Sequence, residues 1–369
     1  MSRSRLIRFS SSICSRYLER KYLTLAHLRT GLLQQVAFQG IRFSHSTWAR
    51  PSSDLGYIEQ QSGALVSTPA FNGECSDFTW LAMNSSLSFS QPRGLLFANC
   101  SFESLGAGAV TVRDGAHGTR IDGCYFADIS GAAVQIGDYD TWNETDPERM
   151  ERDNAVTDCL VENAAAEFHG TVALSVGYST GTQLLHNELR NLTYGGISVG
   201  WGWSRELDTY ASNNTVAFNK IHNFKTLLGD GGGIYALGPQ PESTMNNNWV
   251  YDMASGRGGG GFYPDEGSAF WDISFNVFSN ASSCADDCEW LHIWTSSIHD
   301  ISVHDSWTDT STESNAGTDC TEINTTLVDP ITASSWPEEA RSIMNASGTT
   351  SSLAMSWSQR RRARVQNRQ

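Results

Sequence analysis

Eight copies of one short segment recur along the 369-residue chain, 24–35 residues apart, and this period constrains the fold more than any other feature. The copies begin at residues 99, 123, 158, 186, 218, 247, 275 and 304 and read NCSFESL, GCYFADI, DCLVENA, HNELRNL, FNKIHNF, NNWVYDM, FNVFSNA and HDSWTDT. They alternate polar and apolar residues as strands do and lack sustained helical periodicity. A repeat of this length predicts a solenoid of short β-strands.

Two columns of equivalent residues run through these copies. In a coil of parallel strands, equivalent residues lie about 4.8 Å above one another, so stacked Asn side chains can exchange hydrogen bonds at a turn. We therefore predict an all-β fold, a right-handed parallel β-helix of about eight or more rungs, because parallel crossovers prefer the right hand. The first column is Cys100, Cys124, Cys159, Asn187, Asn219, Asn248, Asn276 and Asp305. The second, apolar column is Phe102, Phe126, Val161, Leu189, Ile221, Val250, Phe278 and Trp307.

The repeat also predicts the domain boundaries. The β-helix domain is expected over residues 36–348 and ends near WPEEARSIM (336–344), which should form a short helix. Residues 1–35 match no repeat and are expected to be a disordered or aberrant segment. Residues 349–369 lack strand alternation and contain an arginine run, so we expect a disordered basic tail. Both ends should pack little against the coil.

The charge of the chain limits its partners. Residues 51–359 contain 11 basic and 39 acidic side chains, a balance that repels phosphate and argues against a nucleic-acid partner. No apolar stretch reaches the ~18 residues of a membrane span, so no membrane partner is expected. Eight Asn-x-Ser/Thr sequons favour a secreted, extracellular glycoprotein, although no signal peptide is visible. We expect a monomer with an oligo- or polysaccharide as its partner.

A further strand in each repeat predicts which side chains point away from the coil. Alternation in GIYALG (233–238), GFYPDE (261–266) and WLHIWT (290–295) turns Ile234, Phe262 and Leu291 inward. Two positions beyond the outward row, Asp265 and Trp294 also face outward. We expect one outward groove, because this face becomes aromatic in its last three rungs. The outward row reads Thr111, Gln135, Ser175, Ser198, Tyr235, Tyr263 and His292.

Two glycine runs, in DGGGIYALG (230–238) and GGGGFYPDEG (258–267), lie beside this row. A dinucleotide site is not indicated, because no helix follows and no βαβ unit surrounds them. Glycines here would keep a floor open between aromatic walls. Asp230 could serve in catalysis if a corner near Gly231–Gly233 brings it towards Asp265. Alternatively, its carboxylate could cap the backbone of the glycine turn.

Five segments resemble right-handed parallel β-helix proteins in or near glycoside hydrolase family 141, which includes fucosidase and xylanase activities. They are GISVGWGWSRE (196–206), DGGGIYALGPQP (230–241), PDEGS (264–268), LHIWTSSIHDI (291–301) and WPEEARSIM (336–344). The resemblance runs from about Val36 to Met344, and family members are usually longer at the N-terminus. It implies that Asp230, Asp265 and Glu266 are the catalytic candidates, since glycosidases commonly use two carboxylates.

The substrate-binding candidates are aromatic or polar side chains of the outward face. Trp201 and Trp203 are expected at the rim of the groove, where exposed indoles stack on sugars; alternatively, they pack under a neighbouring loop. An outward His292 beside an acid suits proton transfer or substrate hydrogen bonding. The complete set is Tyr235, Tyr263, His292, Trp294, Trp201 and Trp203.

The leading hypothesis is a glycoside hydrolase that uses carboxylate acid/base catalysis and needs no cofactor or metal. One alternative is a polysaccharide lyase on the same scaffold, but the outward rows near Asp265 lack the Lys or Arg base of such lyases. Another alternative is a non-catalytic glycan-binding repeat protein. Cys284 and Cys288 should form a small disulfide loop, or remain two free thiols, rather than half of a zinc site.

Overall fold

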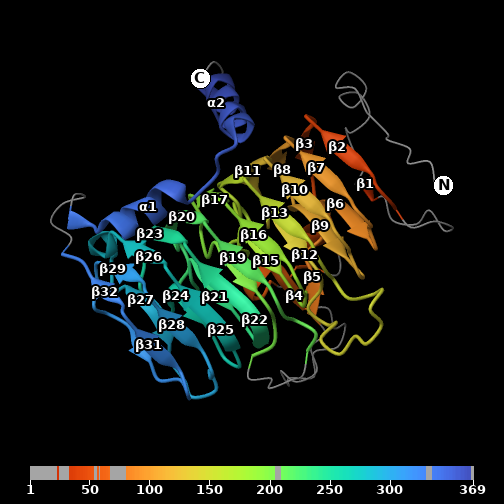
Figure 1. Cartoon of the computed structure of the whole chain (residues 1–369). Helices are drawn as coiled ribbons and strands as arrows, with labels where there is room; N and C mark the ends of the chain where they lie inside the picture. The colour runs from red at the N-terminus through yellow and green to blue at the C-terminus, as the bar shows by residue number, and fades with distance from the viewer. Residues whose placement is uncertain are drawn as a thin grey trace.

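The chain winds into a coil of short parallel strands (Figure 1). The computed structural model describes residues 23–24, 33–53, 56–57, 59–66, 80–203, 209–329 and 335–366. Within these residues the strands form three parallel sheets of ten strands each, and each turn of the coil adds one strand to each sheet. The predicted right-handed parallel β-helix is confirmed.

The three sheets are named in the order in which the chain visits them. The first sheet consists of β1 (Leu23–Thr24), β6 (Ser85–Ser90), β9 (Gly108–Arg113), β12 (Val134–Ile136), β15 (Leu174–Val176), β18 (Ile197–Val199), β21 (Ile234–Ala236), β24 (Gly260–Pro264), β27 (Glu289–Ile293) and β30 (Ser314–Asn315). The second consists of β2 (Ala37–Gln39), β7 (Leu96–Ala98), β10 (Arg120–Asp122), β13 (Ala155–Thr157), β16 (Gln183–Leu185), β19 (Thr215–Ala217), β22 (Pro239–Asn246), β25 (Ala269–Ser274), β28 (Ser302–His304) and β31 (Thr321–Ile323). The third consists of β3 (Arg42–Ser46), β8 (Ser101–Leu105), β11 (Tyr125–Ile129), β14 (Leu160–Glu162), β17 (Glu188–Arg190), β20 (Lys220–Phe224), β23 (Trp249–Met253), β26 (Val277–Ser279), β29 (Trp307–Thr308) and β32 (Thr326–Leu327).

Shorter elements lie outside the three sheets. An antiparallel pair, β4 (Ala64–Val66) and β5 (Trp80–Ala82), belongs to the segment between β3 and β6. Two helices follow the last rung, α1 (Glu338–Ala346) and α2 (Ser352–Gln366). Single 3-10 turns occur at Arg50–Ser52, Gln61–Gly63 and Ala281–Ser283.

The turn between the second and third sheets carries the predicted column of asparagines. The Oδ1 atom of Asn219 accepts hydrogen bonds from the backbone N–H and from Nδ2 of Asn187, both at 3.0 Å. The same pair of bonds joins Asn219 to Asn248 and Asn248 to Asn276. Nδ2 of Asn219 also donates to the carbonyl of Leu184 at 2.8 Å. These buried amides therefore satisfy one another and lock each rung to the next.

The last copy of the repeat is shifted by one residue from the predicted alignment. Ser306, and not Asp305, continues the column, because its Oγ accepts the backbone N–H of the last asparagine at 3.2 Å. The strand register pairs Phe278 with Thr308, so Thr308 takes the inward position that was predicted for Trp307. Asp305 instead has a φ of 50° and occupies the left-handed turn position before the column. Its equivalents with positive φ are Asn99, Gly123, Asp158, His186, Phe218, Asn247 and Phe275.

The interior of the coil is one continuous apolar core. The rings of Phe102 and Phe126 stack with their centroids 4.6 Å apart and only 5° between their planes. Cys100 and Cys124 are buried in the same core as free thiols, as small apolar residues would be. The stacking of equivalent side chains from rung to rung thus builds the core.

One disulfide and one early strand complete the coil. Cys284 and Cys288 form a disulfide, the first of the two predicted possibilities.

Of residues 1–35, the structure describes 23–24 and 33–35. Within these, Leu23 pairs with Leu87, which places β1 beside β6. The expectation that this end packs little against the coil is wrong for β1, because backbone pairing extends the first sheet into it.

Two helices lie on the outer face of the third sheet (Figure 1). Helix α1 packs against β26 and buries Ala340 and Ile343 with Trp336 and Val277, which confirms the short helix predicted there. Helix α2 occupies the segment that was expected to be a disordered tail, and this expectation is wrong. Its residue Ala354 is fully buried in a cluster with aromatic and apolar side chains of β11 and β14.

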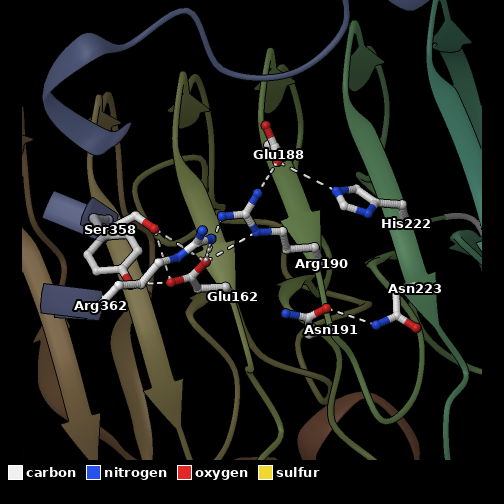
Figure 2. A network of polar contacts seen from close by, with 9 residues as sticks. Glu162, Glu188, Arg190, Asn191, His222, Asn223, Ser358 and Arg362 are labelled. Atoms are coloured by element: carbon white, nitrogen blue, oxygen red, sulfur yellow. Dashed lines mark hydrogen bonds and ion pairs between the residues drawn. The ribbon is translucent and has the colours of Figure 1, made fainter. Parts of the chain in front are cut away.

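A polar network holds α2 on the sheet (Figure 2). The carboxylate of Glu162 accepts hydrogen bonds from Arg190 at 2.7 Å, from the Tyr125 hydroxyl and from Ser358 at 3.2 Å, and Arg362 lies 3.5 Å away. Burial alone would raise the pKa of Glu162, but its bonds to Tyr125 and Arg190 outweigh burial and lower that pKa. An ionised carboxylate therefore anchors the C-terminal helix.

Replacing Asn219 by alanine should lower the free energy of unfolding by about 3 kcal/mol, because it leaves buried backbone donors and acceptors without partners. Asn246→Ala is the matched control, since Asn246 is half-buried and bonds Thr244 on its own strand at 3.1 Å. The control should cost about 0.5 kcal/mol or less. Guanidinium unfolding measures both, and equal losses would contradict the role of the asparagine column.

Replacing Glu162 by glutamine should loosen α2, because the charge that Arg190 and Arg362 contact is removed. Trypsin cleaves after arginine, so the run Arg360–Arg362 reports on the helix. We expect cleavage there to become several-fold faster in Glu162→Gln and to stay unchanged in the exposed control Glu148→Gln. An unchanged cleavage rate in Glu162→Gln would show that the network does not hold the helix.

Candidate functional site

The outward row of the first sheet has the predicted register but is not open to solvent. The strand pairing places Ser198, Tyr235 and Tyr263 one above another. From Thr111 to Tyr263, each member of the row is between 1% and 3% exposed. The expected open groove across several rungs is therefore wrong, because another segment covers the row.

This covering segment, here called the cover, consists of residues 59–66 and 80–83. It comes from the insertion between β3 and β6 and includes β4 and β5. Ser62 Oγ donates to Ser198 Oγ at 3.0 Å, and the hydroxyl of Tyr139 donates to the Ser62 carbonyl at 2.8 Å. Under it lies a second hydrophobic cluster that is separate from the coil interior. Its buried members are Ala64, Ala82, Tyr139, Tyr178, Trp201, Ala211, Tyr235, Leu237 and Tyr263.

Trp201 and Trp203 take the alternative that the sequence left open. Trp201 is 2% exposed, and its ring centroid lies 4.2 Å from that of Tyr139 and 5.6 Å from that of Trp80. Trp203 is half-buried and packs on Trp201 at 4.8 Å. Trp201 thus fills the cluster under the cover, and its expected position at an exposed rim is wrong.

Asp265 follows β24 and is held by two neutral donors. The Tyr235 hydroxyl donates to Oδ2 at 2.6 Å, and Nε1 of Trp294 donates to Oδ1 at 2.8 Å. Burial and the charge of Asp265 raise the pKa values of Tyr235 and Tyr263, so both phenols stay protonated. Trp294, 44% exposed, lies between this carboxylate and solvent.

His292 lies on the same face as Asp265, as predicted. Its ring meets the ring of Tyr263 edge-on at 4.6 Å, and the charge of Asp265 contributes to the raised pKa of Tyr263. Nδ1 of His292 lies 2.5 Å from a carboxylate oxygen of Glu289. The other oxygen of Glu289 accepts from Ser314 at 2.9 Å. Glu289 was missed by the sequence analysis, although it begins β27 directly beside Gly260 in the register.

Asp230 precedes β21 in a corner of the backbone. Its φ is 50°, a left-handed conformation. Its N–H donates to the Arg257 carbonyl at 2.7 Å, and the N–H of Gly231 donates to the Gly258 carbonyl at 3.2 Å. A Cβ atom at Gly259 would lie 2.3 Å from the Gly231 carbonyl oxygen, so a side chain there would clash. The second glycine run therefore allows two backbone corners to approach closely.

The electrostatic environment of Asp230 links it to the other candidates. Partial desolvation raises the pKa of Asp230, even though the residue is open to a pocket. The nearby carboxylate of Asp265 raises it further, as does that of Glu266, whereas Lys225 and His292 oppose the shift. Glu266 itself is half-buried in the turn after β24. Asp230 thus carries a carboxyl group pushed towards its neutral form, whereas both oxygens of Asp265 accept hydrogen bonds from neutral donors.

Asp230 opens into a pocket of about 710 Å³. The cover contributes Glu59 and Gln61 to its wall, and Tyr194 and Arg257 come from the turns on the opposite side. Burial raises the pKa of Glu59, whose carboxylate accepts a hydrogen bond from Thr171 at 2.6 Å. The pocket therefore has acidic walls and a mixed polar and apolar surface.

Gln61 connects this pocket with Asp265. Its Nε2 donates to the Tyr194 hydroxyl at 2.6 Å, and the Tyr194 hydroxyl donates to the Asp230 carbonyl. The Oε1 atom of Gln61 lies 3.2 Å from the Tyr235 hydroxyl, the same group that donates to Asp265. Gln61 therefore lies between the wall of the pocket and the tyrosine that holds the buried carboxylate.

Sequence reasoning found Asp230 and Asp265 but missed Glu59, Gln61 and Tyr194. Glu59 and Gln61 belong to an insertion that matches no repeat, and nothing in their pattern places them against β18 and β21. The available signal was the insertion itself, because a polar segment that interrupts a solenoid often carries function.

The described part of the chain contains no group of three or more His, Cys, Asp and Glu side chains placed to hold a metal ion. None of its helices is long and apolar enough to cross a membrane.

Comparisons with known proteins agree with the fold. No protein-family model and no curated protein sequence matches the chain. Among solved structures, a glycoside hydrolase superposes with a TM-score of 0.65 at 22% identity over 87% of this chain. A periplasmic alginate epimerase gives a TM-score of 0.43 at 8% identity over 80% of this chain and 62% of its own length. A lacto-N-biosidase of glycoside hydrolase family 136 from Eubacterium ramulus gives 0.42 at 11% over 84% of this chain and 60% of its own length. The chain spans 51% of the length of the first of these, and what the likeness establishes is the parallel β-helix.

Proposed function

We propose that this protein is a glycoside hydrolase in which Asp230 and Asp265 are the two catalytic carboxyl groups. The observation that supports this most is their opposed environments. Desolvation and neighbouring carboxylates raise the pKa of Asp230, whereas Tyr235 and Trp294 donate hydrogen bonds to both oxygens of Asp265. Glycosidic cleavage commonly uses two carboxyl groups, one that donates a proton and one that acts as base or nucleophile.

In this proposal Asp230 protonates the oxygen of the leaving group and Asp265 acts as the base or nucleophile. The bond from the sugar carbon to the bridging oxygen breaks, and the proton of Asp230 passes to that oxygen. The sugar carbon then bonds either a water oxygen whose proton Asp265 accepts, or the carboxylate of Asp265, which water displaces in a second step. Glu266 lies near enough to raise the pKa of Asp230 and therefore helps to keep this proton in place. His292 and Trp294 remain candidate substrate contacts, because Trp294 donates to Asp265 and His292 packs against the ring of Tyr263.

The proposed substrate is a neutral oligo- or polysaccharide that enters by a chain end. The cover blocks the first sheet over the rungs that an extended chain would otherwise follow. A pocket of about 710 Å³ accommodates a small ligand rather than a long polymer. Its acidic side chains Glu59, Glu167 and Asp230 outnumber the single guanidinium among the lining residues, that of Arg257, so the pocket offers little positive charge to pair with a uronate.

Substitutions of the two carboxylates should have different effects on leaving groups. Asp265→Asn should lower kcat by about 10²–10⁴-fold on every glycoside, because the role of a base or nucleophile does not depend on the leaving group. Asp230→Asn should lose a similar factor on an alkyl glycoside but little on a dinitrophenyl glycoside, which needs no proton donor. Asp272→Asn, a half-exposed carboxylate of β25, is the matched control and should keep wild-type rates.

The same assays separate this proposal from its alternatives. An unsaturated uronate product would indicate a lyase. Glycan binding without turnover, in the wild type and in all three variants, would indicate a binding protein. Equal losses on both glycosides in Asp230→Asn would contradict its role as the acid.

The product pattern tests entry by a chain end. With a neutral oligosaccharide labelled at its reducing end, we expect the labelled fragment to become shorter by one sugar unit at a time, because the pocket holds the end of the chain. Capillary electrophoresis at early time points measures this. A random ladder of internal fragments from the start would contradict end-on binding while leaving the catalytic pair in place.

A further inference from the structure

One buried lysine contacts the backbone turn beside Asp230. Lys225 follows β20 and is 1% exposed, which is unusual for a lysine. Its Nζ donates to the Gly258 carbonyl at 2.7 Å and to the Arg257 carbonyl at 3.2 Å. Both close acceptors are therefore backbone groups of the second glycine run or of the residue before it.

The same two carbonyls also accept hydrogen bonds from the backbone of the corner that carries Asp230. The Arg257 carbonyl accepts the N–H of Asp230 at 2.7 Å, and the Gly258 carbonyl accepts the N–H of Gly231 at 3.2 Å. The ammonium group of Lys225 and the Asp230 corner thus share both acceptors. A change in the position of these carbonyls would move the carboxyl group of Asp230 directly.

Lys225 also contacts Tyr194, another residue that lines the pocket, through its backbone. Its N–H donates to the carbonyl of Tyr194 at 2.8 Å, and the hydroxyl of Tyr194 donates to the carbonyl of Asp230. Lys225 is not among the residues that line the pocket. It can therefore hold the site together but does not reach a substrate.

The charges around Lys225 are acidic on several elements. Asp230 precedes β21, Glu289 begins β27, and Asp286 belongs to the disulfide loop; all three favour the charged form of the amine. Burial opposes them and lowers the pKa of Lys225 to about 8. Below that pH the amine carries a positive charge among these carboxylates.

We propose that Lys225 is a positioning residue, whose ammonium group clamps the Arg257–Gly258 turn under Asp230 and supplies the positive charge that balances the acidic site. The structural part of this proposal stands on the contacts of Lys225 alone, and its catalytic part rests on the proposed glycosidase function. The two substitutions below separate the clamp from the charge.

Lys225→Gln keeps a donor for the carbonyls but removes the charge, and Lys225→Met removes both. Lys220→Met is the matched control, because Lys220 lies on β20 over the ring of Trp249 at 4.9 Å, on the outer face of the third sheet. The carboxyl ¹³C signal of Asp230, identified by its loss in Asp230→Asn, reports its titration. Both Lys225 variants should shift this titration to higher pH, and Lys220→Met should leave it unchanged.

The rate should separate the two variants further. Lys225→Met should lower kcat by about 10²-fold through misplacement of Asp230, whereas Lys225→Gln should lose less and retain activity to higher pH. An Asp230 titration that does not move in the folded Lys225→Gln variant would overturn the proposal. A titration that moves while even the wild type hydrolyses no glycoside would uphold the positioning role and reject the glycosidase function.

Discussion

The stacking of equivalent positions from one rung to the next is the interaction on which the rest of the structure depends. Buried asparagines bridge four successive rungs. The amide oxygen of each one after the first accepts hydrogen bonds from the backbone N–H and the side-chain amide of the asparagine before it. A slip of one residue would turn every inward side chain outward and leave these amides unpaired. The register is therefore strict, and it brings Tyr235, Tyr263 and His292 side by side although nearly thirty residues of chain separate successive members.

The cover closes a sheet face that an uncovered solenoid would expose. An exposed sheet face would offer a long track for a polymer, but residues 59–66 and 80–83 seal the first sheet and convert its aromatic row into a second core. What stays accessible is the corner where Asp230 opens into the pocket. Gln61 joins both regions, since it contacts Tyr194 beside Asp230 and Tyr235 beside Asp265. The insertion thus completes a site that the repeats alone would leave open.

Repeating features could be predicted from the sequence, and non-repeating ones could not. Alternation within β24 and β27 gave the outward direction of Asp265 and His292, because a strand leaves no other choice. Alternation does not tell whether an outward face meets solvent, so the choice between an exposed and a packed Trp201 stayed open. The predicted alignment of the last rung was wrong by one residue, because Trp307 is apolar like the members of the inward column although Thr308 takes the inward position. Helix α2 was missed because its stability comes from Ala354 and Trp357 packing on β11 and β14, contacts distant in the sequence.

We propose that the covered face leaves one sugar-binding pocket between the cover and the Asp230 corner. A crystal structure of the Asp265→Asn variant soaked with a neutral oligosaccharide tests this proposal most directly. We expect a terminal sugar in contact with Gln61 and Tyr194, with its glycosidic oxygen within hydrogen-bond distance of Asp230. A saccharide bound along the outer face of the second or third sheet, with the pocket empty, would contradict it.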